Sequence, residues 1–374
     1  MQNRRPRVVL APDKFKGSLE AAGVVAALAV GIGRVRPDAE IRRLPVADGG
    51  DGTVAAFLAA GWEPVAVMVA GPTGEPVEAV YAVRGKTAVI ELARVVGLVR
   101  MPGGRLDPLH ASTFGLGQVI GHALDGGVRE IVLGVGGSAS TDGGAGMLQA
   151  LGVRVLDAEG RELARGGAAL ARADRIDGSG SHPALRDTAV TLASDVDNPL
   201  LGRHGAAAIF GEQKGADARQ RGILDAALAN WARLMGPEVA DRPGAGAAGG
   251  TGFGAMAMLG AVERPGIEVI LELIDFADQV AEADLVVTGE GSLDEQTLHG
   301  KAPVGVCAAA RAAGVPVVAV AGRCLLDESE WRAAGFADCY ALSELEPDPK
   351  RSMAAAGPLL EQLGARIALD HLPS

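Results

Sequence analysis

The sequence has few of the residues that disulfide frameworks, zinc sites and nucleic-acid-binding surfaces require. Aromatic residues make up 3% of its 374 residues, and its three cysteines, Cys307, Cys324 and Cys339, include no CxxC pair. The cysteine pattern predicts neither a disulfide framework nor a zinc site, and we expect buried or idle thiols of a reducing cytosol. The few aromatic side chains offer no set of stacking platforms for bases.

Basic and apolar segments of any length are also missing. The net charge is −11, and the only basic cluster is the short Arg4-Arg5-Pro6-Arg7. Binding of nucleic acid therefore has no electrostatic basis. No apolar run approaches roughly 18 residues, and the first residues do not form a signal-peptide core. We expect a cytoplasmic protein that binds neither nucleic acid nor a membrane.

Glycine and apolar residues are abundant instead. The 54 glycines occur in clusters, and 48% of the residues are apolar. Clustered glycine in such a chain indicates backbone that turns tightly or approaches a ligand closely. Lysine is rare: only six of the 35 basic residues are lysine, and four of those six lie in glycine-bearing motifs. These four are candidates for positions that need a compact ammonium group.

Short apolar runs alternate with alanine-rich segments of helical spacing, which predicts a parallel α/β sheet covered on both faces. The expected strands are 8–11, 65–69, 88–92, 131–135, 153–156, 189–193, 285–288 and 317–321. The expected helices are 19–32, with Ser18 as N-cap, and segments near 53–60, 114–125, 143–151, 216–235, 251–260, 267–273, 302–313 and 353–368. We predict a Rossmann-like domain of residues 1–68 and 262–374, with a second α/β domain of residues 69–261 inserted into it.

Two polar motifs lie near the start of the chain. Asp13, Lys14 and Lys16 directly follow the first expected strand. Because ligands of parallel sheets bind at the carboxyl ends of strands, these residues are candidates for binding an anion, although a solvated loop would look similar. Asp48, Gly49 and Gly50 precede the helix near 53–60. They could hold Mg²⁺ or a polyol hydroxyl, or form an acidic turn that caps the helix.

The glycine-rich segment after the strand at 131–135 is the longest motif. It contains Gly136, Gly137, Ser138, Thr141, Asp142 and Gly143. Its N–H groups and hydroxyls are suited to wrapping phosphates. It also fits the dinucleotide pattern G-x-G-x-x-A, with Asp157 about 20 residues further on. A dinucleotide loop turns into its helix at once, whereas this loop continues from Ser138 to Ala145, so we consider that match accidental.

Two further motifs follow later strands. Asp195, Asp197 and Asn198 come after the strand at 189–193, with Lys214 as a nearby candidate cation. Carboxylates at a strand end can accept a proton from a hydroxyl or hold a metal, although an Asx turn is the simpler alternative. Glu290 and Asp294 follow the strand at 285–288 and lead to Lys301. These residue types favour phosphate handling with a hard cation.

Other phosphate and hydrolase motifs are absent. There is no Walker A sequence, no protein-kinase signature and no G-x-S-x-G nucleophile elbow. The residue chemistry thus indicates phosphoryl transfer or phosphate binding and leaves the acceptor open.

The motifs together resemble the bacterial glycerate kinase family of the two-domain type I. The resemblance rests on APDKFKGS, PVADGGDGT, GVGGSASTDGGAGM, DVDNPL, FGEQKGA, PGAGAAGGTG and TGEGSLD with HGKAP, and it covers residues 7 to 370. It implies a Rossmann-like domain with a second α/β domain, an active site in the cleft between them, ATP, Mg²⁺, and D-glycerate as substrate. It implies 2-phosphoglycerate as the usual product, with 3-phosphoglycerate as the alternative.

On this basis we assign candidate roles. Asp195 is the first candidate for the base that accepts the hydroxyl proton, and Asp197 is the second. Lys14, Lys16, Lys214 and Lys301 are candidate cations for the glycerate carboxylate and the γ-phosphate. Asp48, Glu290 and Asp294 are candidate Mg²⁺ ligands. Two remoter alternatives are an NAD-dependent oxidoreductase that uses Gly134 to Ala139 and a non-catalytic glycerate sensor. An oligomer is compatible with the sequence.

Overall fold

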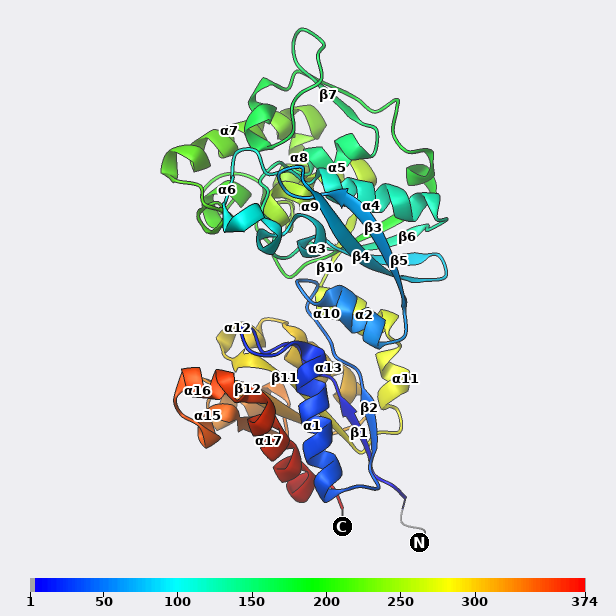
Figure 1. The fold of residues 1–374 in the computed structure, drawn as a ribbon, viewed down its shortest axis with the longest axis vertical. Helices are drawn as coiled ribbons and strands as arrows, with labels where there is room; N and C mark the ends of the chain where they lie inside the picture. The colour runs from blue at the N-terminus through cyan, green and yellow to red at the C-terminus, as the bar shows by residue number, and fades with distance from the viewer. Residues whose placement is uncertain (1–3, 374) are drawn as a thin grey trace. The chain divides into compact units, whose positions relative to one another are not determined.

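The computed structural model describes residues 4–373 and divides the chain into two compact units (Figure 1). Unit 1 comprises residues up to Asp48, then Ala55–Gly61 and the chain from Ile267 onward. Unit 2 comprises Gly49–Val54 and Trp62–Gly266. Unit 1 is thus discontinuous in sequence, and each unit is built around its own sheet.

The sheet of unit 1 has five parallel strands in the order β13-β12-β11-β1-β2. The strands are β1 (Arg7–Leu10), β2 (Glu40–Arg43), β11 (Leu285–Leu293), β12 (Val317–Cys324) and β13 (Asp338–Ala341). Numbered within the unit, the order is 2-1-3-4-5, which is that of flavodoxin-like doubly wound sheets. The direction of winding reverses between β1 and β11, and ligands of such sheets bind beside this reversal, at the carboxyl ends of the strands.

Glycines allow the two longest helices of unit 1 to pack closely. Helices α1 (Ala21–Val35) and α17 (Ala356–His371) lie side by side on one face of the sheet (Figure 1). A Cβ on Gly31 would lie only 2.0 Å from the carbonyl oxygen of Glu361, and one on Gly364 would lie 2.5 Å from that of Leu28. The other helices of the C-terminal part of the chain, where it has returned to unit 1, are α10 (Gly266–Leu273), α11 (Phe276–Val280), α12 (Glu295–Leu298), α13 (Ala302–Ala312), α14 (Glu328–Ala334), α15 (Leu342–Leu345) and α16 (Pro349–Ala354).

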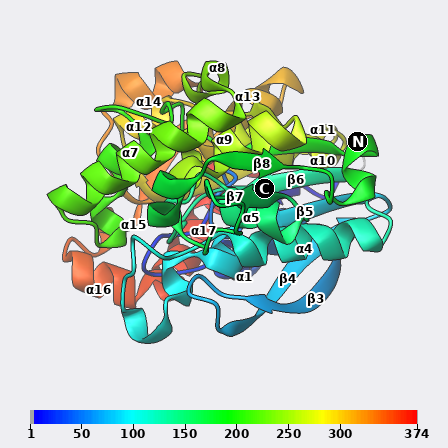
Figure 2. The ribbon, with the colours of Figure 1, turned by 90° about the horizontal axis from the view of Figure 1, so that it is seen from above.

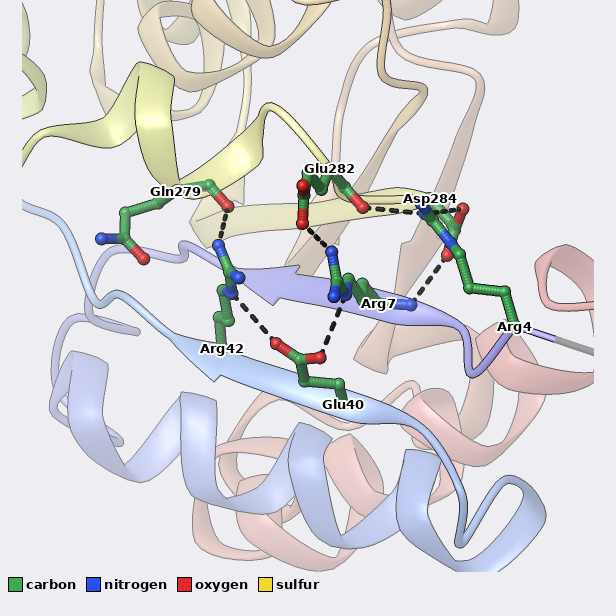
Figure 3. A network of polar contacts seen from close by, with 7 residues as sticks. All are labelled: Arg4, Arg7, Glu40, Arg42, Gln279, Glu282 and Asp284. Carbon is green, nitrogen blue, oxygen red and sulfur yellow. Dashed lines mark hydrogen bonds and ion pairs between the residues drawn. The ribbon is translucent and has the colours of Figure 1, made fainter.

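Ion pairs join the amino ends of β1, β2 and β11 in unit 1 (Figure 3). Arg7 begins β1 and pairs with Glu40 of β2 (3.0 Å) and with Glu282, while its backbone N–H donates to Asp284 (2.8 Å). Arg4 also pairs with Asp284 (2.8 Å). Arg4 and Arg7 of the short basic cluster are therefore neutralised within the fold, at the end of the sheet opposite to the strand ends that carry the polar motifs.

The sheet of unit 2 is mixed, which corrects the expectation of parallel strands for this part of the chain. Its order is β10-β9-β6-β5-β4-β3. The strands β5 (Thr87–Glu91), β6 (Glu130–Gly134), β9 (Ala189–Ala193) and β10 (Val262–Arg264) are parallel, whereas β3 (Glu63–Ala70) and β4 (Pro76–Arg84) are antiparallel to their neighbours. The physical reason is the tight turn Gly85-Lys86, where the positive φ of Gly85 (63°) lets β4 fold directly back onto β5.

Helices cover the sheet of unit 2 and enclose an apolar core. Helix α4 (Phe114–Asp125) packs against β3 and β5 and against α5 (Ala145–Ala150), as Figure 2 shows. The other helices are α2 (Thr53–Ala59), which begins in this unit, α3 (Ala93–Val96), α6 (Ala206–Phe210), α7 (Ala218–Met235), α8 (Pro237–Ala240) and α9 (Ala247–Leu259). The expected strand 153–156 lies outside the main sheet: β7 (Arg154–Leu156) pairs only with β8 (Arg175–Asp177).

The start of the first helix also differs from the prediction. Helix α1 begins at Ala21 and its N-cap is Glu20, so Ser18 is not the cap. Gly17 has a φ of 78° and closes a tight loop in which Phe15 and Leu19 bond each other's backbones. This loop turns Ser18 away from the helix, and its hydroxyl donates to the carbonyl of Met353 (2.9 Å).

Among residues 4–373, no helix is both long enough and apolar enough to cross a membrane. All three cysteines are free thiols. Burial raises the pKa of Cys307 to about 11.

Candidate active site

In unit 1, the polar motifs meet at the carboxyl ends of β1 and β11, the point where the sheet reverses its winding. The chain leaves β1 with Ala11, whose N–H donates to Val287 (2.8 Å), and the N–H of Asp13 donates to Gly289 (2.8 Å). On the other side, the N–H of Val46 donates to Pro12 (3.0 Å). These bonds fix Asp13 between β11 and the segment that leads to Asp48.

Neighbouring carboxylates raise the pKa values of Asp13 and Glu290 in this region. Burial, followed by the negative charge of Asp48, raises the pKa of Asp13 to about 8, and Glu290 adds to this increase. Burial likewise raises the pKa of Glu290, to which Asp294 and Asp48 contribute, while Thr297 and Lys301 oppose it. A cation bound nearby would lower these raised pKa values, because it stabilises the ionised form of a carboxyl group.

Two of the sequence-predicted residues in this region also have local structural roles. Asp294 is the N-cap of α12 and accepts the N–H of Gln296 (3.0 Å) and the hydroxyl of Ser292 (3.2 Å). Lys301 donates to the side chain of Gln296 (3.3 Å) and lowers the pKa of Glu290. Thr297, which was not among the residues selected from the sequence, donates its hydroxyl to Glu290 (2.5 Å).

In unit 2, the loop that begins at Gly49 packs backbone to backbone against the ends of two strands. A Cβ on Gly49 would lie 2.8 Å from the carbonyl oxygen of Ala193, and one on Gly134 would lie 2.5 Å from the oxygen of Gly49. A Cβ on Gly136 would lie 2.7 Å from the Cα of Gly50. Only glycine allows these contacts, so the structure brings together three motifs that are distant in the sequence.

Glu91 is a functional candidate that the sequence reasoning missed. It ends β5, beside Gly134 of β6, and its side chain is completely buried. Its Oε2 accepts the N–H of Val54 (3.0 Å) and lies 3.6 Å from Nε of Arg94. Burial raises the pKa of its carboxyl. The available signal was a single carboxylate within an otherwise apolar strand, at its carboxyl end.

The hydroxyls of the glycine-rich loop lie inside unit 2. Ser138, Ser140 and Thr141 are all buried, whereas Gly136 is half-buried and Gly137 is exposed. The Ser138 hydroxyl contacts that of Ser140 (3.1 Å). The part of this motif that a phosphate can reach is therefore the backbone at Gly136 and Gly137.

Lys214 lies beneath this loop. Its ammonium donates to the carbonyl of Ser140 and lies 3.5 Å from the hydroxyl of Ser138. Only 2% of the residue is exposed, and burial lowers the pKa of its amine to about 7, against the opposing influence of Asp142. The lysine thus contacts the loop from the inside.

Asp142 is fully buried and surrounded by donors from two segments. It accepts the N–H groups of Thr113 (2.8 Å), Gly144 (3.3 Å) and Gly146 (3.3 Å), and the hydroxyls of Thr113 and Ser112. Burial nevertheless raises the pKa of Asp142. These bonds tie the end of the glycine-rich loop, including Gly143, to the start of α4. Ser112 and Thr113 were not selected from the sequence, since they lie about 30 residues away from Asp142.

The carboxylates after β9 lie at the surface of unit 2. Asp195 is exposed, and its Oδ1 accepts the N–H of Gly266 (3.0 Å). Asp197 is also exposed and contributes to the raised pKa of Glu263, whose main cause is burial. Asn198 donates to the carbonyl of His204 (2.9 Å), which holds the turn after these carboxylates.

The rival dinucleotide interpretation does not fit the local structure. Asp157, which would have to bind a ribose, instead accepts the N–H groups of Glu159 and Arg161 and pairs with the Arg161 guanidinium (2.9 Å). These bonds lower its pKa. The helix after the glycine-rich loop, α5, begins only at Ala145 and has six residues.

Unit 1 thus gathers several charged residues at the carboxyl ends of its strands, and Lys16 is exposed beside them: Asp13, Lys14, Asp48, Glu290, Asp294 and Lys301. Unit 2 gathers Gly49, Gly50, Gly136 and Asp195 with Glu91, and holds Ser138, Thr141, Asp142 and Lys214 in its interior. Within residues 4–373, no three His, Cys, Asp or Glu side chains form a group that could bind a metal ion without further ligands.

Comparison with known proteins identifies the family. The model of the Glycerate kinase family matches residues 8–371. A glycerate kinase of Halalkalibacterium halodurans is 43% identical over 97% of both chains, and the glycerate 2-kinase of Escherichia coli is 44% identical over 84% of this chain and 85% of its own. A crystal structure from Salmonella typhimurium, described as glycerate kinase 2, aligns over 98% of both chains at 40% identity with a TM-score of 0.84. The chain therefore belongs to the glycerate kinase family and is an enzyme of the kinase class.

Proposed function

We propose that this enzyme transfers the γ-phosphoryl group of ATP, with Mg²⁺, to the 2-hydroxyl of D-glycerate. The observation that carries this proposal is the set of carboxylates and lysines at the winding reversal of unit 1, in a chain 44% identical to a glycerate 2-kinase. Phosphoryl transfer depends mainly on positioning and on charge neutralisation, which such a set supplies.

The residues of unit 1 fit a hard divalent cation. Mg²⁺ in kinases is bound by one or two carboxylates, with phosphate oxygens and water as its other ligands. Asp48 and Glu290 are the first candidates, since the charge of Asp48 contributes to the raised pKa of Glu290. Asp294, which also contributes to that increase, is the third candidate. When bound, the ion would neutralise charge on the triphosphate. Lys14, Lys16 and Lys301 are candidates for the remaining anionic groups of the two substrates.

In unit 2, we assign Asp195 the role of the base that accepts the proton of the attacking hydroxyl, with Asp197 as the second candidate. Asp195 lies just after the carboxyl end of β9 and its side chain is exposed, so a substrate hydroxyl can reach the carboxylate. The N–H groups at Gly136 and Gly137 are candidates for contacting phosphate oxygens, because this backbone is the accessible part of the glycine-rich motif.

Phosphorus NMR of the product tests both the turnover and the position of transfer. The purified enzyme is incubated with ATP, Mg²⁺ and D-glycerate, and the proton-coupled ³¹P spectrum is recorded. A phosphate on C2 couples to one proton and gives a doublet, whereas a phosphate on C3 couples to two and gives a triplet. We expect the doublet. A triplet would establish 3-kinase regiochemistry, and the absence of any phosphate ester would refute the proposed reaction.

A further inference from the structure

The loop of residues 49–52 is rich in glycine, yet it must hold one conformation to serve a site. Gly49 and Gly52 have φ values of 92° and 101°, in the left-handed region that glycine adopts at little cost. Such a segment loses much conformational freedom when it is ordered. It is flanked by Asp48 and contains Asp51, so its conformation sets where the chain presents these acidic residues.

The side chains of Thr53 and Glu91 restrain this loop. Within it, Thr53 bonds the carbonyl of Gly50 through its hydroxyl (2.6 Å) and its N–H (3.3 Å). From outside, Glu91 accepts the N–H of Val54 (3.0 Å), and the N–H of Gly52 helps to lower the pKa of the same carboxyl. These N–H groups belong to the start of α2, so Glu91 acts as a capping carboxylate supplied by a strand of the sheet.

The burial of Glu91 shows that this contact is maintained at a cost. Its side chain has no exposed surface, and the nearest cation, Arg94, is 3.6 Å away. Among residues 4–373, its second oxygen, Oε1, has no hydrogen-bond partner. A buried and only partly satisfied carboxyl is unfavourable for folding alone. An apolar residue would suit the end of a central strand better unless the cap itself is needed.

We propose that Glu91 is a positioning residue that holds the loop of residues 49–54 in the conformation required for phosphoryl transfer. It acts through the N–H of Val54 at the start of α2 and touches no substrate. The consequence for catalysis rests on the proposed function, whereas the consequence for the loop does not.

Hydrogen–deuterium exchange and steady-state kinetics of three variants test this proposal. Glu91→Ala removes the acceptor, and Glu91→Gln retains a carbonyl oxygen of nearly the same shape. The matched control is Glu130→Ala, which removes a glutamate from the amino end of the adjacent strand β6, where it accepts the hydroxyl of Thr87 (2.7 Å). Exchange is followed in peptides covering residues 49–54, and kcat and KM are measured for glycerate and ATP.

We expect amide exchange in residues 49–54 to be at least about ten-fold faster in Glu91→Ala, the range for a lost hydrogen bond to a charged group. Exchange in Glu91→Gln should also be faster than in wild type, but only by up to about three-fold, because a neutral amide oxygen is a weaker acceptor than a carboxylate. Glu130→Ala should not differ from wild type. In Glu91→Ala, kcat/KM should fall by about 10- to 100-fold. Unchanged exchange, or faster exchange with unchanged kcat/KM, would overturn the proposal.

Two further outcomes are informative. If Glu91→Ala does not fold, Glu91→Gln alone decides: a local increase of up to about three-fold, confined to residues 49–54, supports the proposal, and no local change refutes it. If wild-type enzyme does not phosphorylate glycerate, the proposed function fails, while the exchange data still decide whether Glu91 holds the loop.

Discussion

The buried amine of Lys214 predicts an unusual dependence of stability on pH. Its pKa is about 7 in the folded protein, against an ordinary value of 10.5. Between these two values the unfolded chain binds more protons than the folded protein, so the free energy of unfolding rises with pH. Below pH 7 the lysine is protonated in both states, and the cost of burying its charge is present in full.

The magnitude follows from the two pKa values. Their difference corresponds to about 5 kcal/mol as an upper limit, at about 1.4 kcal/mol for each pH unit over which the two states differ by one proton. Between pH 7 and pH 9 this contribution should raise the free energy of unfolding by about 2 kcal/mol. Lys214→Met removes it. The variant also loses the bond to Ser140, which is a constant offset that does not change with pH.

Asp142 reinforces the expected difference. Without the nearby ammonium, burial raises the pKa of Asp142 further, because Lys214 is the cation that favours its charged form. A carboxyl with a raised folded-state pKa loses stability as the pH increases toward that value. The stability of Lys214→Met should therefore fall relative to wild type as the pH rises, and Asp142 contributes in the same direction.

Urea denaturation at pH 6, 7, 8 and 9 measures this effect. We expect the free energy of unfolding of wild type minus that of Lys214→Met to increase by about 2 kcal/mol or more from pH 7 to pH 9. Lys86→Met is the control, since Lys86 is exposed and its replacement should leave the pH profile parallel to that of wild type. A difference that stays constant, or decreases with pH, would refute the interpretation of Lys214 as a buried amine of lowered pKa.

Three other substitutions probe the site. Asp142→Asn should destabilise the protein by about 2–4 kcal/mol in urea denaturation, because an amide NH₂ would face the N–H donors that now surround the carboxylate; wild-type stability would contradict this. Asp195→Asn should lower kcat about 10²- to 10⁴-fold with folding intact, and an unchanged kcat would exclude Asp195 as the base. Gly136→Ala places a Cβ 2.7 Å from the Cα of Gly50, so it should lower the free energy of unfolding by about 1–3 kcal/mol and also lower the activity. A Cβ on Gly33 in α1 has no atom within 4 Å, so Gly33→Ala should leave the free energy of unfolding unchanged or raise it by up to about 1 kcal/mol. Equal effects of the two glycine substitutions would disprove the packing argument.

The positions of the polar motifs were predictable from the sequence because they depend on short-range patterns. Asp13, Gly136 and Asp195 each follow an apolar run, and each indeed lies just after a strand. The directions of side chains were not predictable in the same way. Ser138 looks like a phosphate-binding serine in sequence, but it points toward Lys214, which is 76 residues away in the chain.

The same limit explains the errors in the fold. The antiparallel strand β4 follows from a two-residue turn, and the edge strand β2 has only four residues, two of them arginine. Neither segment has the continuous apolar pattern by which buried parallel strands are recognised. Glu91 was missed for the opposite reason: the strand that contains it is so apolar that one carboxylate appeared incidental.

The glycines of the phosphate-handling motifs have a role that their sequence pattern does not reveal. Glycine-rich loops are usually interpreted as backbone that approaches a ligand, but Gly49, Gly134 and Gly136 approach other backbone of the same unit. Their lack of a side chain lets the loop at residue 49 lie directly on the ends of β6 and β9. Because the backbone packing holds one side of this loop, the side-chain contacts on its other side fix the rest of its conformation, and the loss of one such contact should have a large effect. We therefore expect the loop to be sensitive to substitution of Glu91, although this residue lies outside the motifs that were recognised in the sequence.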